Sequence, residues 1–289
     1  MKAPKFSYVR AESVEQVLAL IDRHGSDARI LAGGQSLMPT LNMRLSQPAM
    51  LIDINRLDAL KGISIADGMV RIGALARHVD VLNSPIIAAH LPLIAEAMPH
   101  VAHLAVRNRG TFGGSIALAD PAAEMPACAL ALQAKIVVES AKGRRTIPVA
   151  DYFIGLYETA RQPNEMVMEV LIPSQSADAV SVFMELSRRH GDFAMAGIAC
   201  CLRLERDVVA EARLVYFGSE GKPTLAKRAI NAIQRKPWAV ENIEATCAAL
   251  ATDLAPMKSL EAEPAMLLHL QRVLTRRALT TALERARAQ

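Results

Sequence analysis

The stretches Ala32-Gly33-Gly34-Gln35-Ser36 and Thr111-Phe112-Gly113-Gly114-Ser115 each place a Gly-Gly pair after an apolar or basic run and before an apolar one. A backbone without Cβ atoms can approach an anion closely, and successive N–H groups in such a turn form a concave nest for a phosphate. A Gly-Gly pair alone most often marks an ordinary loop. The residues around both pairs are what favour an anion site.

The first motif lies between a predicted strand and a predicted helix. Arg29 to Ala32 is a short apolar run typical of a buried strand end, and Ser36 stands where it could cap a helix over Leu37 to Leu45. A strand that ends in glycines at a helix N-terminus is well suited to an anion, because free N–H groups and the helix dipole point the same way.

The second motif leads through an apolar run to Asp120-Pro121-Ala122-Ala123-Glu124. Asp120 fits a helix N-cap and Pro121 the first helical position, so the sequence predicts a helix over Pro121 to Gln133. Two polar groups, Asp120 and Glu124, therefore follow the second motif within one predicted helical start.

Taken together, the motifs resemble those of a known family. The pattern A-G-G-x-S-L-x-P from residue 32, T-x-G-G-[NS] from residue 111 with D-P-A-A-E behind it, and G-D-F-A at Gly191 to Ala194 are similar to the FAD-binding medium subunit of molybdenum hydroxylases. That group includes the flavoprotein subunits of aerobic carbon monoxide dehydrogenase and quinoline oxidoreductase, and the central part of xanthine dehydrogenase. The resemblance runs from Phe6-Ser7-Tyr8 to the C-terminal helices.

The resemblance implies FAD as the cofactor of this chain, with the pyrophosphate held by the backbone of both glycine motifs. The residues carried over are Ala32, Gly33, Gly34, Gln35, Ser36, Leu37, Thr111, Phe112, Gly113, Gly114 and Ser115. Ser115 stands where many relatives have Asn. Asp120 and Glu124 match positions that face the ribityl or ribose hydroxyls, and helix capping is the equal alternative. Phe193 matches a position near the isoalloxazine ring, and a place in the core is its alternative.

In this reading the chain has no catalytic residue of its own, because the flavin does the chemistry. The resemblance implies a molybdenum cofactor on a large partner subunit and [2Fe-2S] clusters on a small one, in a heterohexamer. Electrons would pass through this chain's FAD to an external acceptor such as NAD, a quinone, a cytochrome or oxygen. The run from His100 to Gly110 favours an N-heteroaromatic substrate for the whole enzyme. The alternative is a self-contained FAD oxidase of the vanillyl-alcohol oxidase type.

The fold implied is α+β: a two-subdomain FAD-binding fold followed by an antiparallel three-stranded sheet with helices. We expect subdomains at 1–57 and 58–175 and a C-terminal domain at 176–289. A capping box at Ser13 predicts a helix over Val14 to His24, and consecutive strand-like runs from Val180 to Phe217 predict the antiparallel sheet. Further helices are predicted at Val79 to Asn83, Ile86 to Met98, Leu225 to Ile233, Ala239 to Ala251 and Ala265 to Arg287.

Composition excludes several other classes. The net charge is +4, yet the basic residues are scattered and only 4% of residues are aromatic, which argues against nucleic-acid binding. The sequence shows neither a membrane span nor a signal peptide, so we expect a cytoplasmic protein. The densest basic segment, Arg272 to Arg287, indicates an amphipathic helix or a subunit interface. Arg107 and Arg109 could support a phosphate, pair with a partner's carboxylates or lie in a solvated loop.

No metal site is expected in this chain. Its four cysteines, Cys128, Cys200, Cys201 and Cys247, form no C-x-x-C pair, so we predict reduced core thiols and place the clusters on other chains. His90, His100 and His103 lack the carboxylate of an H-E-x-x-H pattern and are expected on a helix surface or in the core.

Overall fold

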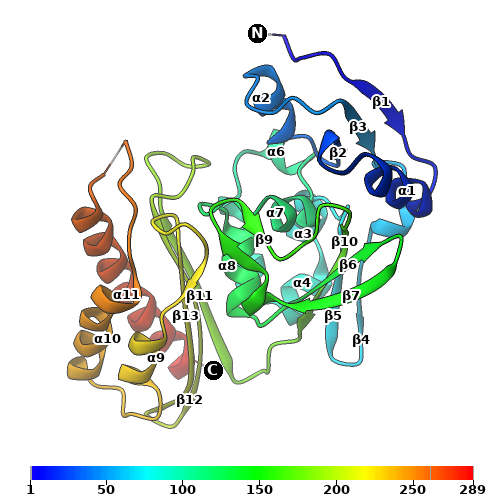
Figure 1. Ribbon diagram of the computed structural model, residues 1–289. Coiled ribbons are helices and arrows are strands. Elements are labelled where there is room, and N and C mark those ends of the chain that lie inside the picture. Colours follow the sequence, from blue (N-terminus) through cyan, green and yellow to red (C-terminus); the bar gives the residue numbers. More distant parts are fainter. Residues whose placement is uncertain (1, 261, 289) are drawn as a thin grey trace.

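The computed structural model describes residues 2–260 and 262–288, and the three larger of its sheets follow one another along the chain (Figure 1). The first has three strands, the second five and the third four, and helices pack against each of them. The α+β class predicted from the sequence is confirmed. The domain boundaries at residues 57 and 175 remain a prediction. The first sheet lies before residue 57, the second between residues 57 and 175, and the third after residue 175.

The first sheet is parallel. Its strands run in the order β1 (Ser7–Arg10), β3 (Met50–Asp53) and β2 (Ala28–Leu31). The predicted helix over Val14 to His24 is confirmed as α1 (Val14–His24), and the Ser13 side chain accepts a hydrogen bond from Gln16 N at 3.2 Å. The predicted helix after the first motif is shorter than expected, α2 (Leu37–Asn42). The elements β2, α2 and β3 form a β-α-β unit, and the first glycine motif is its first turn.

The second sheet is antiparallel, with strands in the order β4 (Ile63–Ala66), β5 (Met69–Gly73), β10 (Met166–Pro173), β6 (Lys135–Ser140) and β7 (Gly143–Pro148). Short helices lie between β5 and β6: α3 (His78–Leu82), α4 (Pro85–His90), α5 (Pro92–Ala97), η3 (Met98–His100), α6 (Leu104–Arg107), α7 (Phe112–Leu118) and α8 (Glu124–Ala131). A small hairpin, β8 (Phe153–Gly155) with β9 (Glu158–Thr159), precedes β10.

The single helix predicted over Ile86 to Met98 is wrong, because the chain breaks between α4 and α5. Leu91 separates the two helices with φ −135° and ψ 60°. Pro92 is the cause, since it disfavours the helical conformation in the preceding residue and has no N–H to continue the ladder.

The third sheet has four strands, where three were predicted: β11 (Ala179–Leu186), β12 (Ala196–Glu205), β13 (Val208–Phe217) and β14 (Thr224–Leu225). The fourth strand has two residues. The sequence prediction assigned no element to Thr224 and placed Leu225 at the start of a helix. Helices α9 (Lys227–Ile233), α10 (Val240–Asp253) and α11 (Pro264–Ala288) form a layer beside the sheet, and α5 and α8 pack on it as well (Figure 1).

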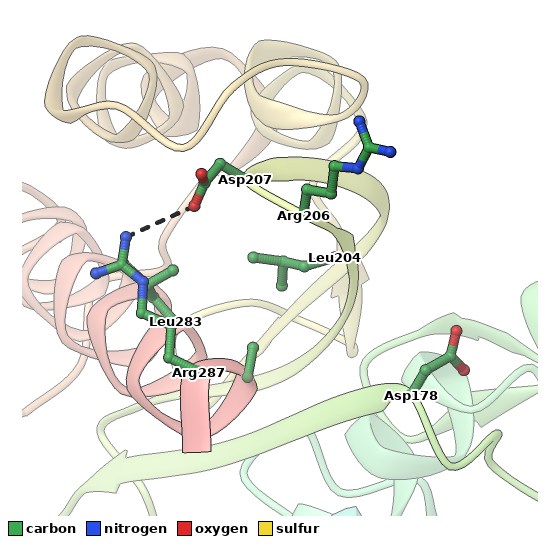
Figure 2. A pocket seen from close by; sticks show the side chains of 7 residues that line it. Asp178, Leu204, Arg206, Asp207, Leu283 and Arg287 are labelled. Atoms are coloured by element: carbon green, nitrogen blue, oxygen red, sulfur yellow. Dashed lines mark ion pairs between the residues drawn. The ribbon is translucent and has the colours of Figure 1, made fainter. Parts of the chain in front are cut away.

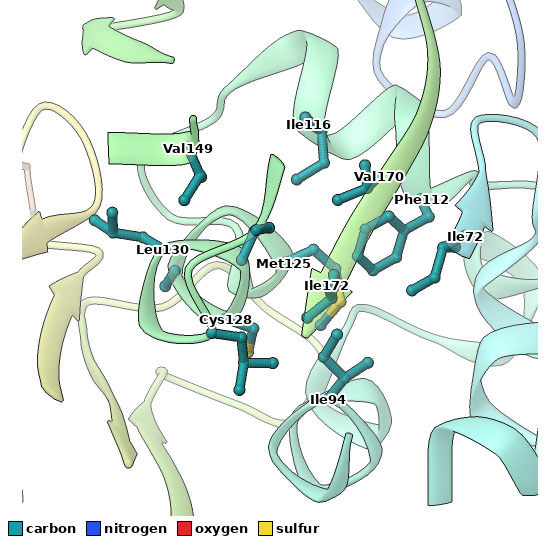
Figure 3. Close-up of a cluster of buried hydrophobic side chains, with 14 of the residues drawn as sticks. Ile72, Ile94, Phe112, Ile116, Met125, Cys128, Leu130, Val149, Val170 and Ile172 are labelled. Atoms are coloured by element: carbon teal, nitrogen blue, oxygen red, sulfur yellow. The ribbon is translucent and has the colours of Figure 1, made fainter. Parts of the chain in front are cut away.

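The core of the second unit continues into the third sheet. Phe112, Ile116, Met125 and Ile172 lie among the side chains at its centre (Figure 3). Phe183 and Phe217 of the third sheet belong to the same buried cluster, where their rings stack with centroids 5.5 Å apart. The second unit and the third sheet therefore share one hydrophobic core.

The basic C-terminal segment is part of α11, and its apolar side is used within the chain. Leu274 and Leu279 are buried in the cluster between α11 and the third sheet. Arg276 pairs with Glu244 at 2.8 Å, and Arg285 pairs with Glu96 of α5 at 2.7 Å. The amphipathic-helix interpretation is confirmed, and a partner interface on this helix remains a prediction.

All four cysteines are free, and Cys128, Cys200 and Cys247 are buried, as predicted for core thiols. Within the described residues no helix is long and apolar enough to cross a membrane.

Candidate functional site

The two glycine motifs, about eighty residues apart in sequence, lie against each other through their backbones. A Cβ atom added to Gly33 would stand 2.4 Å from the carbonyl oxygen of Arg109 and 2.8 Å from Cα of Gly110. Only a residue without a side chain allows the first motif to approach the segment that leads into the second. The two motifs are therefore close enough to contribute to one site, which remains a prediction.

The first motif presents unused backbone donors. In the part of the chain that the structure describes, no hydrogen bond is formed by the backbone N–H groups of Gly33, Gly34, Gln35 and Ser36. Gly34 has φ +73°, a conformation that favours glycine, and Gln35 folds its side-chain amide back to Gly33 O at 3.0 Å. Four consecutive free donors next to a glycine in the left-handed region suit an anion.

Ser36 does not cap α2 with its side chain, contrary to the prediction. Its backbone is already in the helical region, with φ −103° and ψ −42°, whereas a capping serine normally has an extended backbone. Leu37 opens the helix, and Met38 N bonds Gly34 O at 3.0 Å instead.

The second motif is the first turn of a helix and not an open turn. Thr111 caps α7, and its side chain accepts a hydrogen bond from Gly114 N at 3.1 Å. Phe112 is fully buried in the core. Gly113 is required by packing, because a Cβ there would stand 2.5 Å from Cα of Ala74, which directly follows β5. The N–H groups of Phe112 and Gly113 bond the carbonyls of Ala76 and Ala74, and Ser115 N bonds Thr111 O at 3.1 Å.

A polar tie that the sequence prediction missed joins the first unit to the second motif. Arg77 donates to Asn55 Oδ1 at 2.5 Å and to the carbonyl oxygen of Arg109, the same oxygen that faces Gly33. Asn55 in turn donates to Ala32 O at 2.8 Å. Arg77 thus holds both glycine motifs at once. Its position follows no local sequence pattern, because its partners lie 22 and 32 residues away.

A buried histidine packs against Gly110, the residue before the second motif. His78 is 6% exposed, and a Cβ on Gly110 would stand 3.2 Å from its Nδ1. Burial lowers the pKa of His78 to about 4, and the charges of Arg107 and Arg77 act in the same direction. The ring is therefore neutral at physiological pH and adds no charge beneath the motif.

Asp120 and Glu124 lie where the third sheet meets the second unit, and the predicted helix start between them is wrong. The helix begins at Glu124 with Ala123 as its N-cap, because Asp120 bonds Ala122 N at 2.9 Å in a turn. Asp120 also accepts a hydrogen bond from Tyr157 at 3.3 Å, and burial raises its pKa. Burial and then the neighbouring charge of Glu185 raise the pKa of Glu124 to about 8.

Phe193 is not a core residue, since 71% of it is exposed. It stands in the loop between β11 and β12, after Gly191 at φ +78°. Residue 191 must be glycine, because a Cβ would stand 2.5 Å from the ring of His103. Gly218 N of the third sheet bonds Pro121 O at 2.9 Å, which keeps this sheet next to the segment that follows the second motif.

The arginines before the second motif behave differently from each other. Arg107 is committed within the chain, since its guanidinium donates to the carbonyls of Val101 and Ala102, both at 2.8 Å. The guanidinium nitrogen that makes these two bonds is therefore not free to support a phosphate or to pair with a partner's carboxylate, two of the roles that the sequence left open for Arg107. Arg109 contributes its carbonyl oxygen to the tie made by Arg77.

Among the described residues, no group of three or more His, Cys, Asp or Glu side chains could hold a metal ion. His90 bonds Ser174 at 3.0 Å, and His100 faces Glu185 at 3.5 Å.

The chain matches two family models in succession. Residues 4–175 match the FAD binding domain in molybdopterin dehydrogenase, and residues 181–282 match the CO dehydrogenase flavoprotein C-terminal domain. The chain is 38% identical over 288 residues to the 6-hydroxypseudooxynicotine dehydrogenase complex subunit alpha of Paenarthrobacter nicotinovorans, covering 99% of this chain and 97% of the relative. It is 40% identical over 228 residues to the carbon monoxide dehydrogenase medium chain of Hydrogenophaga pseudoflava, covering 79% of each chain.

Solved structures agree. The carbon monoxide dehydrogenase of Hydrogenophaga pseudoflava superposes with a TM-score of 0.96 at 36% identity, and quinoline 2-oxidoreductase of Pseudomonas putida 86 with 0.94 at 32%, each covering 99% of both chains. These relatives are subunits of oxidoreductase complexes, and the match to the FAD binding domain makes FAD the cofactor of this chain. The chain thus belongs to the FAD-binding medium subunits of the molybdenum hydroxylase family.

Proposed function

We propose that the free N–H groups of residues 33 to 36 hold the pyrophosphate of FAD, with the N-terminal end of α7 on the other side. The single observation that carries this proposal is the backbone approach of Gly33 to Arg109, which brings the unused donors to the second motif. The residues fit the cofactor, because the anion needs donors without side chains in the way, and the first motif offers four.

The remaining residues of the proposed site extend from the pyrophosphate toward the third sheet. We infer that Asp120 and Glu124, which follow α7, bind sugar or ribityl hydroxyls, and that the exposed ring of Phe193 contacts the isoalloxazine. Thr111, Gly114 and Ser115 form the α7 end of the site, while Phe112 and Gly113 shape it through packing. Ala32 and Leu37 flank the free donors of the first motif.

FAD bound here supplies two-electron redox chemistry, and this chain binds and orients it. We propose that electrons arrive from [2Fe-2S] clusters on a small partner subunit, after oxidation of the substrate at a molybdenum centre on a large one, and leave to an external acceptor. The names of the relatives support this, since they are medium chains or subunits of dehydrogenases or of a hydroxylase.

We propose an N-heteroaromatic substrate for the whole complex. Among the similar proteins are the nicotine 6-hydroxylase medium subunit at 36% identity and the caffeine dehydrogenase subunit beta at 40%, besides quinoline 2-oxidoreductase. Carbon monoxide dehydrogenase is equally similar, so the test is turnover of the complex with quinoline or nicotine against carbon monoxide.

A self-contained flavin oxidase would need its own substrate cavity at the flavin. One hollow of about 280 Å³ lies at the turn between β12 and β13 and the end of α11, lined by Leu204, Arg206 and Leu283 among others (Figure 2). Phe193 precedes the start of β12, and this hollow lies at the far end of that ten-residue strand, roughly 33 Å away. This hollow is therefore not part of the proposed flavin site, whereas another of about 280 Å³, lined by Arg188, Arg189 and Asp192, lies in the loop that carries Phe193.

The deciding experiment is a tagged purification from the native host. Three subunits that co-purify with flavin absorbance, iron and molybdenum would support the electron-transfer function. A yellow protein without iron or partners would overturn it in favour of the self-contained oxidase.

A further inference from the structure

A chain of hydrogen bonds leads to the two glycine motifs, and it begins on the first strand. The hydroxyl of Tyr8 in β1 donates to Oδ2 of Asp53 at the end of β3. Arg10 pairs with Asp53 in the strand register, and side chains two residues apart share a face, so Tyr8 reaches the carboxylate diagonally. Tyr8 belongs to the stretch Phe6-Ser7-Tyr8 of the family resemblance, to which the proposed FAD site gives no role.

Asp53 holds the side chain of Asn55 with its other oxygen. Its Oδ1 accepts hydrogen bonds from the backbone N–H of Asn55 at 2.8 Å and from the side-chain Nδ2 at 2.6 Å. Burial works to raise the pKa of Asp53. The hydrogen bonds from Tyr8 and Asn55, with the charge of Arg10, outweigh it and leave the pKa below its ordinary value. The carboxyl group is therefore ionised at neutral pH, and an ionised carboxylate can only accept hydrogen bonds.

The acceptor oxygen of Asp53 fixes which way the amide of Asn55 points. The Nδ2 that Asp53 holds also donates to Ala32 O at 2.8 Å, and Oδ1 is left to accept from Arg77 at 2.5 Å. A reversed amide would set its oxygen against the carbonyl of Ala32 and the carboxylate of Asp53, and its NH2 group against the guanidinium of Arg77. Only one orientation of the amide therefore joins all three partners.

The oriented amide gives Arg77 the acceptor that it needs to reach the second motif. The guanidinium donates to Asn55 Oδ1 and to the carbonyl of Arg109. That carbonyl is the one that faces Gly33 of the first motif. Each hydrogen bond in this chain pairs a donor with an acceptor because the carboxylate of Asp53 accepts at its start.

We propose that Asp53 is a positioning residue of the FAD site: it orients the amide of Asn55, and through Asn55 and Arg77 it sets how the two glycine motifs stand around the pyrophosphate. The inference rests on the proposed function, which puts the pyrophosphate between the free N–H groups of residues 33 to 36 and the N-terminal end of α7. Among the described residues, the side chain of Asp53 bonds Tyr8 and Asn55 and neither motif. Loss of this carboxylate should therefore weaken FAD binding without removing a group that touches the cofactor.

The first test is a double-mutant cycle measured as FAD affinity. Titration of the flavin-free chain with FAD should show that Asp53→Ala weakens binding about tenfold, because hydrogen bonds to a charged group are lost and the amide is free to reverse. Asn55→Ala should weaken binding by a similar factor. In the Asn55→Ala background, Asp53→Ala should change the affinity by less than about twofold, because a residue that acts through another then has nothing to act on. Asp58→Ala is the matched control, an exposed aspartate that bonds Lys61 at 2.7 Å.

The second test separates orientation from charge and from folding. Asp53→Asn keeps an acceptor oxygen for Asn55 and turns its NH2 group toward Tyr8, whose hydroxyl can accept as well as donate. This variant should bind FAD within about threefold of the wild type, because the hydrogen bonds that orient the amide persist. Tyr8→Phe removes one hydroxyl from the exposed end of the chain of bonds, and its smaller loss of affinity should vanish in the Asn55→Ala background. Urea unfolding of each flavin-free variant shows whether it is folded, and Tyr8→Phe carries the cycle if Asp53→Ala is not.

The outcomes separate this inference from the proposed function. A wild-type chain that binds no FAD contradicts the proposed function. A wild-type chain that binds FAD, with Asp53→Ala as tight as Asp58→Ala, overturns the positioning role of Asp53 alone. Losses that multiply in the Asp53→Ala, Asn55→Ala double variant overturn it as well, because each residue would then act independently. An Asp53→Asn variant as weak as Asp53→Ala would show that the charge matters and the orientation does not.

Discussion

At the scale of single residues, Gly33 is the position where the packing of the two motifs and the proposed FAD site both require the absence of a side chain. A methyl group there would overlap the carbonyl of Arg109, which belongs to the backbone and cannot rotate away. We expect Gly33→Ala to weaken FAD binding about 10- to 100-fold, equivalent to about 1–3 kcal/mol of overpacking. Titration of the flavin-free chain with FAD, followed by flavin fluorescence, measures the effect.

The matched control is Gly221→Ala, because the nearest atom to a Cβ at Gly221 is Met257 Sδ at an ordinary 3.7 Å. Equal loss of affinity in both variants would show that Gly33 has no special place in the site.

Gly34→Val and Gly114→Val should also reduce binding: the first puts a β-branched residue at φ +73°, and the second places Cβ 2.6 Å from the capping oxygen of Thr111.

Glu124 gives the stability of the chain a pH dependence with a definite sign. Its pKa is raised from an ordinary value of 4.5 to about 8 in the folded chain, so its stabilising contribution is complete below about pH 4.5 and is lost as pH rises through 8. Glu124→Gln, which stays neutral, should flatten the fall in unfolding free energy over this window. Urea denaturation at several pH values tests it, and an unchanged slope in the variant would contradict the assignment.

The sequence alone was enough to single out the glycine motifs, because the need for glycine arises from the backbone of that same residue. It predicted capping poorly. Asp120 and Pro121 form a good N-cap pair locally, yet Asp120 bonds Ala122 N in a turn and Tyr157 across the chain, and the helix starts at Glu124. The sequence left two equal alternatives for Phe193, a place in the core and one near the flavin. Only its exposed fraction of 71% excludes the core.

At the scale of elements, Arg77 decides how the first unit sits against α7. Its two donors reach Asn55 and the carbonyl of Arg109, a geometry that suits a planar guanidinium and not an ammonium. We expect Arg77→Lys to weaken FAD binding roughly tenfold, since hydrogen bonds to charged groups contribute about 1.5–3 kcal/mol and one of two is lost. The near-ultraviolet circular dichroism of the bound flavin should change with it.

The control for this variant is Arg71→Lys, an exposed arginine on β5. Should Arg77→Lys bind FAD as tightly as Arg71→Lys does, the tie between the units would have no role in the site.

Elements with strong local signals were predicted to within a few residues, as α1 and the three long strands of the third sheet show. The failures have physical causes beyond the local pattern. Pro92 divides one predicted helix into two, and the two-residue strand β14 exists only because β13 offers it an edge. The Arg77 hydrogen bonds join segments 22 and 32 residues apart, which no periodicity reveals.

At the scale of the whole molecule, the shared core between the second unit and the third sheet predicts one cooperative unfolding transition. Phe217 is fully buried in that core, stacked on Phe183, whereas Phe193 is largely exposed. Phe217→Ala should therefore cost about 3–5 kcal/mol and lower the temperature at which both the sheet and the flavin are lost. Phe193→Ala, the same change at an exposed site, should keep the transition temperature and alter only the flavin spectrum.

Differential scanning calorimetry of the FAD-loaded chain, with flavin fluorescence recorded on the same temperature scale, tests both variants. Excess FAD at 100 times its dissociation constant should stabilise the wild type by about 2.7 kcal/mol, because ligand binds only the folded state. If the third sheet melted separately while the flavin stayed bound, the shared core would not couple them. One core across both units requires a single heat-absorption peak, with the flavin released at the same temperature. This peak should shift downward in Phe217→Ala and stay unshifted in Phe193→Ala.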